Sequence, residues 1–286
     1  MAHRLNGFAR GLPLIGHWAA TRPPIVPVVR LSGVIGQGSR LRPTLNLESV
    51  AQTLARAFAV RNAAAVALVI NSPGGAPVQA GLIFKRIRDL ATEKDLKVYV
   101  FAEDVAASGG YMLALAGDEV FVHEASIVGS IGVVYAGFGF PAALAKLGVE
   151  RRLYTAGEAK ALLDPFSPEK ADEVAKLKAM QQDIHAYFKA LVRDRRGAKL
   201  GEDPERLFNG DVWVGARAVE LGLADGIGDI RGVMREKFGP KVRLRLIEAP
   251  RRLWFRSSAV LGQHGAGADD LLAAIGERAA WARFGL

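Results

Sequence analysis

The sequence contains no cysteine. Disulfide bonds and thiolate metal sites are therefore excluded, and the composition fits a reducing compartment. Histidine is sparse as well: the five histidines are scattered, and no two stand at the spacing of a metal-ligand pair. We therefore expect neither a metal nor any other cofactor.

Long apolar runs are also missing. No uninterrupted apolar run reaches the about 18 residues that a transmembrane helix needs. A short apolar stretch near the N-terminus is interrupted by Pro13, Gly16 and His17, which is not typical of a signal peptide. The sequence alone thus predicts a cytoplasmic protein that touches the inner membrane at most from its surface.

Acidic residues are scarce near both ends of this basic chain, whose net charge is +9. Residues 1–30 hold four arginines and no acid, and residues 241–256 hold six basic residues against one glutamate. With Trp18 and Trp254 nearby, these basic ends are suited to peripheral contact with an anionic membrane. The alternative is a solvated, solubilising surface. Nucleic acid also attracts basic chains, but we expect no nucleic-acid partner.

The 286 residues, half of them hydrophobic, suffice for a substantial core. Apolar runs of strand length alternate with stretches of helical spacing, which predicts an α/β fold with a mainly parallel sheet. The predicted strands are residues 25–31, 64–70, 98–103, 119–123, 127–135, 151–155 and 243–247. The predicted helices are 47–59, 77–90, 141–147, 167–196, 203–208, 215–221 and an amphipathic helix at 269–284. In helix 77–90 the residues expected to face inward are Val78, Leu82, Ile83, Ile87 and Leu90.

Ser108 stands between the predicted strand 98–103 and an apolar run, and two glycines follow it. Glycine allows a sharp turn, so Ser108 would lie at a bend that opens a helix, with backbone N–H groups beside its hydroxyl. Such a serine is one half of an acyl-transfer site. The plainer interpretation is an N-cap serine that opens an ordinary helix.

Lys160 follows a β-rich run and Gly157. A serine hydroxyl is a weak nucleophile until a neighbouring base removes its proton, and a lysine can do this if burial keeps it neutral. Lowering a lysine pKa from ~10.4 to near 7 costs about 4 to 5 kcal/mol, which the fold must supply. The plainer interpretation is a solvated surface lysine.

Four segments occur in one order: Asn71-Ser72-Pro73-Gly74-Gly75, Ala107-Ser108-Gly109-Gly110-Tyr111, Gly129-Ser130-Ile131-Gly132-Val133 and Ala156-Gly157-Glu158-Ala159-Lys160. Their order and spacing resemble the one-domain members of the signal peptide peptidase A family of serine proteases. The resemblance runs from about residue 25 to 239. It implies a basic arm at 1–24, a protease domain at 25–239 and a basic extension at 240–286 that ends in the amphipathic helix.

The resemblance implies the spiral β-β-α fold that enoyl-CoA hydratases (crotonases) share with the proteolytic subunit of the Clp protease. It also implies a serine endopeptidase with a Ser108–Lys160 dyad, acting on extended apolar peptides such as signal peptide remnants. Gly74, Gly75 and Gly109 would hold the oxyanion, and Ser130 would hold the lysine amine toward the serine. Ile131, Gly132 and Val133 would pair with the substrate backbone as a strand. A homo-oligomer is implied, with serine and lysine either in one protomer or meeting at a subunit boundary.

Three alternatives remain. A Ser-His-Asp triad would use His123, which ends the predicted strand 119–123, the next strand after Ser108. An acyl-CoA enzyme of the same fold could use similar glycine-rich loops, although no glutamate pair is evident. A third alternative is an inactive scaffold that binds peptides or a membrane through the basic ends.

Overall fold

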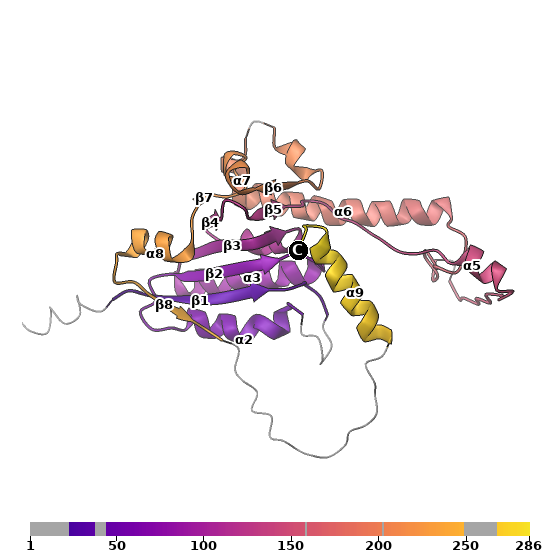
Figure 1. The fold of residues 1–286 in the computed structure, drawn as a ribbon, viewed down its shortest axis with the longest axis horizontal. Helices are drawn as coiled ribbons and strands as arrows, with labels where there is room; N and C mark the ends of the chain where they lie inside the picture. Colours follow the sequence, from indigo (N-terminus) through magenta and orange to yellow (C-terminus); the bar gives the residue numbers. More distant parts are fainter. Residues whose placement is uncertain (1–22, 38–43, 158, 202, 249–267) are drawn as a thin grey trace, which may run out of the picture.

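A computed structural model describes residues 23–37, 44–157, 159–201, 203–248 and 268–286. Residues 1–22 of the predicted basic arm at 1–24 lie outside these ranges, and so do the tryptophans at 18 and 254, half of the basic stretch 241–256 and the predicted break at 265–267. Figure 1 shows an open sheet with helices packed around it and one long segment that projects away from it.

The eight strands of the described residues are β1 (Ile25–Ser32), β2 (Val66–Ser72), β3 (Val98–Ala107), β4 (Glu119–Val122), β5 (Ile127–Gly129), β6 (Val212–Val214), β7 (Gly226–Ile227) and β8 (Arg243–Leu246). The α-helices are α2 (Leu47–Phe58), α3 (Pro77–Lys94), α4 (Gly109–Ala114), α5 (Pro141–Lys146), α6 (Ala171–Arg196), α7 (Gly215–Glu220), α8 (Ile230–Phe238) and α9 (Ala268–Ala282). Two short 3-10 helices lie at Gly197–Lys199 and Pro204–Phe208. None of these helices is long and apolar enough to cross a membrane.

The sheet is mainly parallel, as the strand–helix alternation predicts. Its order is β6-β5-β3-β2-β1-β8, and β4 pairs with both β3 and β7. All pairs are parallel except β5 with β6. Because parallel strands end at one edge, the loops after β1, β2 and β3 meet there, as Figure 1 shows at the arrowheads.

Both faces of the sheet are covered, and β2 shows this directly. Val66, Leu68 and Ile70 belong to the larger core cluster with side chains of α2 and α3. Ala67 and Val69 point to the opposite face and pack in a second cluster with side chains of α8. A strand buried on both faces needs a continuous apolar run, which is why residues 64–70 carry one.

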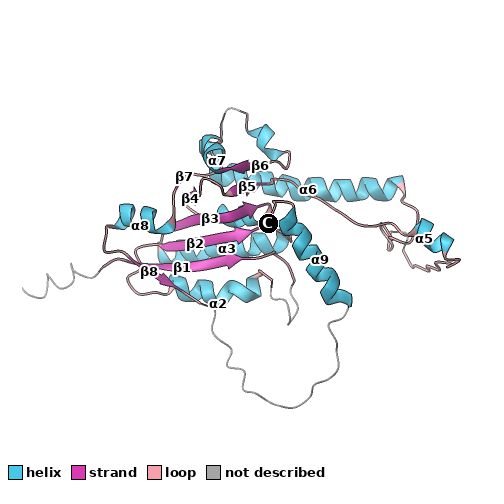
Figure 2. Cartoon of the chain, viewed as in Figure 1, coloured by secondary structure: helices cyan, strands magenta, loops and turns pink. Residues whose placement is uncertain are grey.

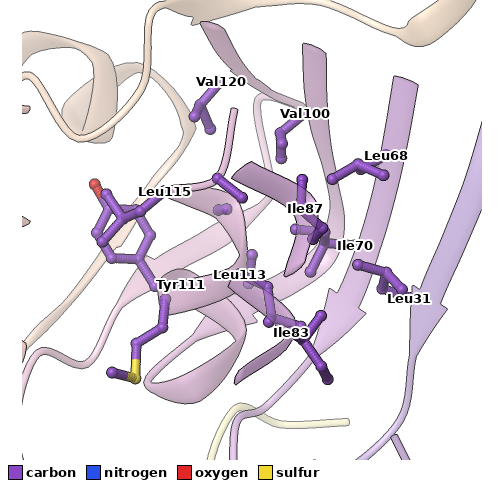
Figure 3. Close-up of a cluster of buried hydrophobic side chains, with 14 of the residues drawn as sticks. Leu31, Leu68, Ile70, Ile83, Ile87, Val100, Tyr111, Leu113, Leu115 and Val120 are labelled. Atoms are coloured by element: carbon purple, nitrogen blue, oxygen red, sulfur yellow. The ribbon is translucent and has the colours of Figure 1, made fainter. Parts of the chain in front are cut away.

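The larger core surrounds α4, the short helix that begins after Ser108. Figure 3 shows Tyr111, Leu113 and Leu115 of this region among side chains of the central strands and of α3. Tyr111 is fully buried, and its hydroxyl donates a 2.8 Å hydrogen bond to the carbonyl of Leu223. Burial raises the pKa of this phenol far above its ordinary value. The helix behind Ser108 is therefore anchored in the core.

Two expectations for apolar side chains of α3 are wrong. Val78 and Leu82 are exposed, at 69% and 41%, whereas Ile83, Ile87 and Leu90 are buried as expected. The stripe of α3 that faces the sheet consists of Ala80, Ile83 and Ile87. Helical periodicity therefore turns Val78 and Leu82 outward.

The chain between β5 and α6 departs furthest from expectation. Strand β5 ends at Gly129, and the predicted continuation to 135 is absent because Gly129 and Ser130 both have positive φ. The predicted strand 151–155 is also absent; these residues are exposed and pair with no strand of the described chain. Helix α6 begins at Ala171 and not at Ser167, whose hydroxyl instead donates to Asp164. Figure 2 shows this segment as long loops around α5, away from the sheet.

Candidate active site

Ser108 lies at the turn between β3 and α4. Its φ of 52° and ψ of −122° are a conformation that side-chain-bearing residues rarely adopt, and holding it costs about 1–3 kcal/mol. Hydrogen bonds fix the turn: the Ser108 N–H donates to the Gly129 carbonyl at 2.8 Å, and the Tyr111 N–H donates to the Ser108 carbonyl at 2.9 Å. The Ser108 side chain makes no capping hydrogen bond. The N-cap interpretation therefore does not account for this hydroxyl, which belongs to a half-buried residue.

The two glycines after Ser108 pack closely against neighbouring residues, Gly110 more tightly than Gly109. A Cβ on Gly110 would stand 2.4 Å from the Ser72 carbonyl oxygen, which no side chain can tolerate. A Cβ on Gly109 would stand 3.3 Å from the backbone nitrogen of Gly75. The serine turn and the loop after β2 are thus in direct contact.

The loop after β2 is held by its own side chains. The Asn71 amide donates to Asp104 at 2.7 Å, and its oxygen accepts the Val105 N–H at 3.3 Å. Ser72 is completely buried; its hydroxyl donates to the Gly33 carbonyl at 2.7 Å and accepts the Gly74 N–H at 3.2 Å. These bonds fix the loop beside Ser108.

Gly74 and Gly75, both predicted to hold an oxyanion, differ in their backbone N–H groups. The Gly74 N–H is already bonded to Ser72, whereas the N–H groups of Gly75 and Gly109 have no acceptor among the described residues. These two free donors flank Ser108. Gly75 takes a φ of 138°, and a Cβ there would stand 2.0 Å from the Ile35 carbonyl oxygen. Only glycine therefore fits this position.

Ser130, Ile131, Gly132 and Val133 pass close to Ser108. Ser130 is buried, and its N–H donates to the Asp211 carbonyl at 2.7 Å. Ser130, Gly132 and Val133 line the same pocket as Ser108, although they do not form the predicted strand. The carbonyl of Ile131 lies 3.1 Å from Nε2 of His185 on α6, which ties this segment to the helix.

The pocket around Ser108 has a volume of about 490 Å³. Its walls include Met112 after the serine turn, Ile184 and Phe188 of α6, and Ala280 and Arg283 at the C-terminal end of the chain. Sequence reasoning missed the contributions of α6 and α9, because neither helix carries a motif that says which loop it will face. Arg283 is the one charged side chain among the described residues that line this pocket.

Lys160 does not line the pocket. It is exposed and lies in the loop between α5 and α6, where its N–H donates to the Gly157 carbonyl at 3.3 Å. His123 is also exposed and outside the pocket lining, and its Nδ1 accepts the Ala125 N–H at 3.1 Å. Within one chain, the structure thus brings together Ser108, Gly75, Gly109 and Ser130, but it brings neither candidate base to them.

A mainly parallel α/β sheet with a strained serine between a strand and a helix, facing a glycine loop, has the Clp-protease-like fold. A mutant of the membrane-bound stomatin-specific protease 1510-N superposes with a TM-score of 0.50 at 15% identity, over 80% of this chain and 99% of that one. At this identity the likeness concerns the fold alone. The family model for peptidase family S49 matches residues 91–238, more than half of the chain. The chain belongs to that family.

Two curated relatives align with this chain over only part of their own length. A Brucella abortus protein named Na(+)/H(+) antiporter NhaA is 54% identical over 272 residues, which cover 91% of this chain and 37% of that protein. The chloroplastic serine protease SPPA of Arabidopsis thaliana is 33% identical over 168 residues, covering 56% of this chain and 24% of that protein. The chain therefore spans well under half the length of the Brucella relative it matches.

Proposed function

We propose that this chain is a serine endopeptidase that cleaves extended, apolar peptides, with Ser108 as its nucleophile. The observation that carries the proposal is the pair of N–H groups, those of Gly75 and Gly109, that lack an acceptor among the described residues and flank a serine held in a strained turn. Acyl transfer needs such donors fixed in advance where negative charge develops. Membership of peptidase family S49 supports the same chemistry.

In the proposed reaction the Ser108 hydroxyl attacks the scissile carbonyl carbon and its proton passes to the neutral amine of Lys160. The carbonyl oxygen becomes an oxyanion that accepts hydrogen bonds from the Gly75 and Gly109 N–H groups. Lys160 then protonates the leaving amine, and an acyl-enzyme remains on Ser108. Lys160 then deprotonates a water molecule, which attacks the ester carbon, and the proton returns from Lys160 to the Ser108 oxygen as the acid product leaves. Ser130, beside Ser108 in the pocket, would orient the lysine amine.

The exposed position of Lys160 leads us to propose that the dyad is completed between two copies of the chain. A lysine acts as a base only when it is desolvated, and the loop that carries Lys160 leaves it in solvent. The same projecting segment exposes large apolar side chains, including Tyr135, Phe138 and Tyr154, the last two at 83% and 90%. Burial of this surface against a second copy would form a homo-oligomer and supply the desolvation.

The apolar walls of the pocket support the proposed substrate class. Met112 and Phe188 are buried beneath it, and Val133, Val134 and Ile184 complete an apolar lining. We expect an extended peptide to lie along residues 131–133. Its pairing there as a strand requires the Gly132 N–H to leave the Ser130 carbonyl, to which it donates at 2.9 Å. No acidic side chain lines the pocket within the described ranges, which disfavours an acyl-CoA enzyme that uses glutamates. The name of the Brucella abortus relative gives no second candidate function, because this sequence matches only 37% of the protein that bears the name.

The test is covalent labelling by a serine-directed phosphonate, followed by intact mass. We expect wild type to be labelled, and expect Ser108→Ala to abolish labelling. Lys160→Ala should slow labelling by about 100-fold or more, since general-base catalysis supplies factors of that order. Lys146→Ala is the matched control, because Lys146 is another exposed lysine of the projecting segment. Unlabelled wild type, or equal loss in both lysine variants, would reject the proposed dyad.

Mixing the two inactive variants tests the arrangement between copies. If Lys160 serves a neighbouring Ser108, mixed oligomers of Ser108→Ala and Lys160→Ala contain some complete sites and should recover activity. If the dyad forms within one chain, the mixture stays as inactive as its components.

A further inference from the structure

The C-terminal helix α9 and the residue that follows it contribute to the wall of the Ser108 pocket. Ala280 and Arg283 line it together with Ser108, Gly75 and Ser130. In Figure 1, α9 (yellow) lies at the edge of the sheet where β2 and β3 end. The helix is not part of the core: from residue 274 onward it has no fully buried side chain.

Arg283 is the single charge among the described residues of this pocket. The remaining lining consists of glycine, serine, asparagine, proline and apolar side chains. Arg283 is exposed, its guanidinium lies 6.0 Å from the ring centre of Phe284, and it has no ion pair with a carboxylate among the described residues. A guanidinium in a neutral groove attracts a carboxylate on the ligand, and its planar donors can bind both oxygens.

We propose that Arg283 is a specificity-determining residue that selects peptides carrying a carboxylate close to the cleaved bond. This inference rests on the proposed peptidase function and narrows its substrate class to apolar peptides with one negative charge in the groove. The carboxylate can be a free C-terminus, as in fragments left by an earlier cleavage, or the side chain of Asp or Glu. In both cases the chemistry that Arg283 recognises is the same.

The size of the effect follows from the exposure of Arg283. Exposed ion pairs contribute little, so we expect a preference of about fivefold for the charged peptide, which corresponds to about 1 kcal/mol. The preference should weaken in about 1 M salt, where the screening length falls to about 3 Å.

The experiment compares three versions of one N-acetylated apolar peptide: a neutral C-terminal amide, the free acid, and an amide in which one Gln is replaced by Glu. Binding is measured on full-length Ser108→Ala by isothermal titration calorimetry, and kcat/KM is measured on the enzyme with Ser108 intact. We expect at least one charged peptide to exceed the neutral amide, and the two charged forms identify the source of the carboxylate.

Variants assign the preference to Arg283. Arg283→Gln should bring the ratio of charged to neutral peptide close to one, and Arg283→Lys, which keeps the charge but not the planar donors, should restore part of the preference. Arg278→Gln is the matched control: Arg278 is an exposed arginine of α9 that does not line the pocket. Equal binding of all three peptides by the protein with Arg283 intact, or an equal effect of Arg278→Gln and Arg283→Gln, would overturn the inference.

The binding assay and the cleavage assay distinguish failure of this inference from failure of the proposed function. A protein that cleaves all three peptides equally keeps the proposed function and loses this inference. A protein that cleaves none of them, yet binds the charged peptide through Arg283, keeps the inference and loses the proposed function.

Discussion

The buried hydroxyl of Ser72 accepts the N–H of Gly74, while the next N–H, that of Gly75, has no partner among the described residues beside Ser108. We expect Ser72→Ala to lower kcat by about tenfold while KM changes little, because the loop that carries the Gly75 donor loses its tether to the Gly33 carbonyl. Ser126→Ala is the control. Ser126 is also buried and bridges backbone groups, but it lies away from the pocket. Both variants should lose about 1–3 kcal/mol of unfolding free energy, and only Ser72→Ala should slow catalysis. Equal rates in the two variants would contradict this role.

A comparison of Gly75→Ala with Gly33→Ala distinguishes the cost of a steric clash from the cost of a positive φ. Gly75→Ala would place its Cβ 2.0 Å from the Ile35 carbonyl oxygen, whereas Gly33, which also has positive φ, has nothing within 4 Å of an added Cβ. Gly33→Ala should cost about 1–2 kcal/mol from its conformation alone. Gly75→Ala should cost clearly more, and urea unfolding of both variants measures the difference. A smaller loss of unfolding free energy for Gly75→Ala than for Gly33→Ala would show that the backbone around Ile35 moves to relieve the clash at little cost.

Asp225 joins α6 to the sheet and should make stability depend on pH. Burial alone would raise the pKa of Asp225, but hydrogen bonds from Arg196, Lys199 and the Val120 N–H outweigh it and lower the pKa below its ordinary value. A lowered carboxyl pKa contributes stability above the unfolded pKa of about 3.9, and this stability is lost as pH falls through the folded pKa.

Asp225→Asn should therefore destabilise the protein by about 3 kcal/mol at pH 7, since it removes the partner of the buried Arg196. The difference from wild type should shrink when unfolding by urea is repeated near pH ~3, below the unfolded pKa. Asp229→Asn serves for comparison. Asp229 caps α8 and asparagine caps nearly as well, so its loss should be small. A difference for Asp225→Asn that is constant with pH would argue against the proposed ionic contribution.

Tyr111 should make stability depend on pH in the alkaline range. Its pKa is raised by burial, so folding favours the neutral phenol, and this contribution is fully present below the unfolded pKa of about 10 for tyrosine and is lost as pH rises toward the folded value. Tyr111→Phe should cost about 1–3 kcal/mol at pH 7, because the Leu223 carbonyl loses its donor. Between pH ~9 and ~11, on either side of the unfolded pKa, thermal unfolding of the variant should depend less on pH than that of wild type. An identical pH dependence would contradict this assignment.

Much of the fold could be predicted from local patterns. The apolar run at residues 64–70 predicts a strand buried on both sides, and β2 is one. The turn residues around Ser108 and Gly75 were identified because glycine has a distinct backbone requirement that is visible in the sequence. Elements whose structure follows from the pattern of their own residues are therefore the ones that the sequence predicts best.

The rest depended on contacts that no local pattern encodes. Residues 151–155 have the composition of a strand but find no partner strand within the described chain, so they stay irregular. Residues 131–134 leave the sheet because Ser130 takes a left-handed conformation, which its sequence neighbours do not announce. Arg283 reaches the pocket from the far end of the sequence, and only the folded chain reveals its proximity to Ser108.

Strand β8 has a consequence for the order in which the protein can be completed during synthesis. It pairs with β1, so Ile25 finds its neighbour Arg243 only after nearly the whole sheet has been translated. At about 5–20 residues per second, the outer edge of β1 waits on the order of 10–40 seconds for its partner. An open edge is a template for pairing with another nascent chain. The groups left open on this edge include the carbonyls of Pro24 and Val28, which accept the N–H groups of Arg243 and Ile247 only once β8 has paired.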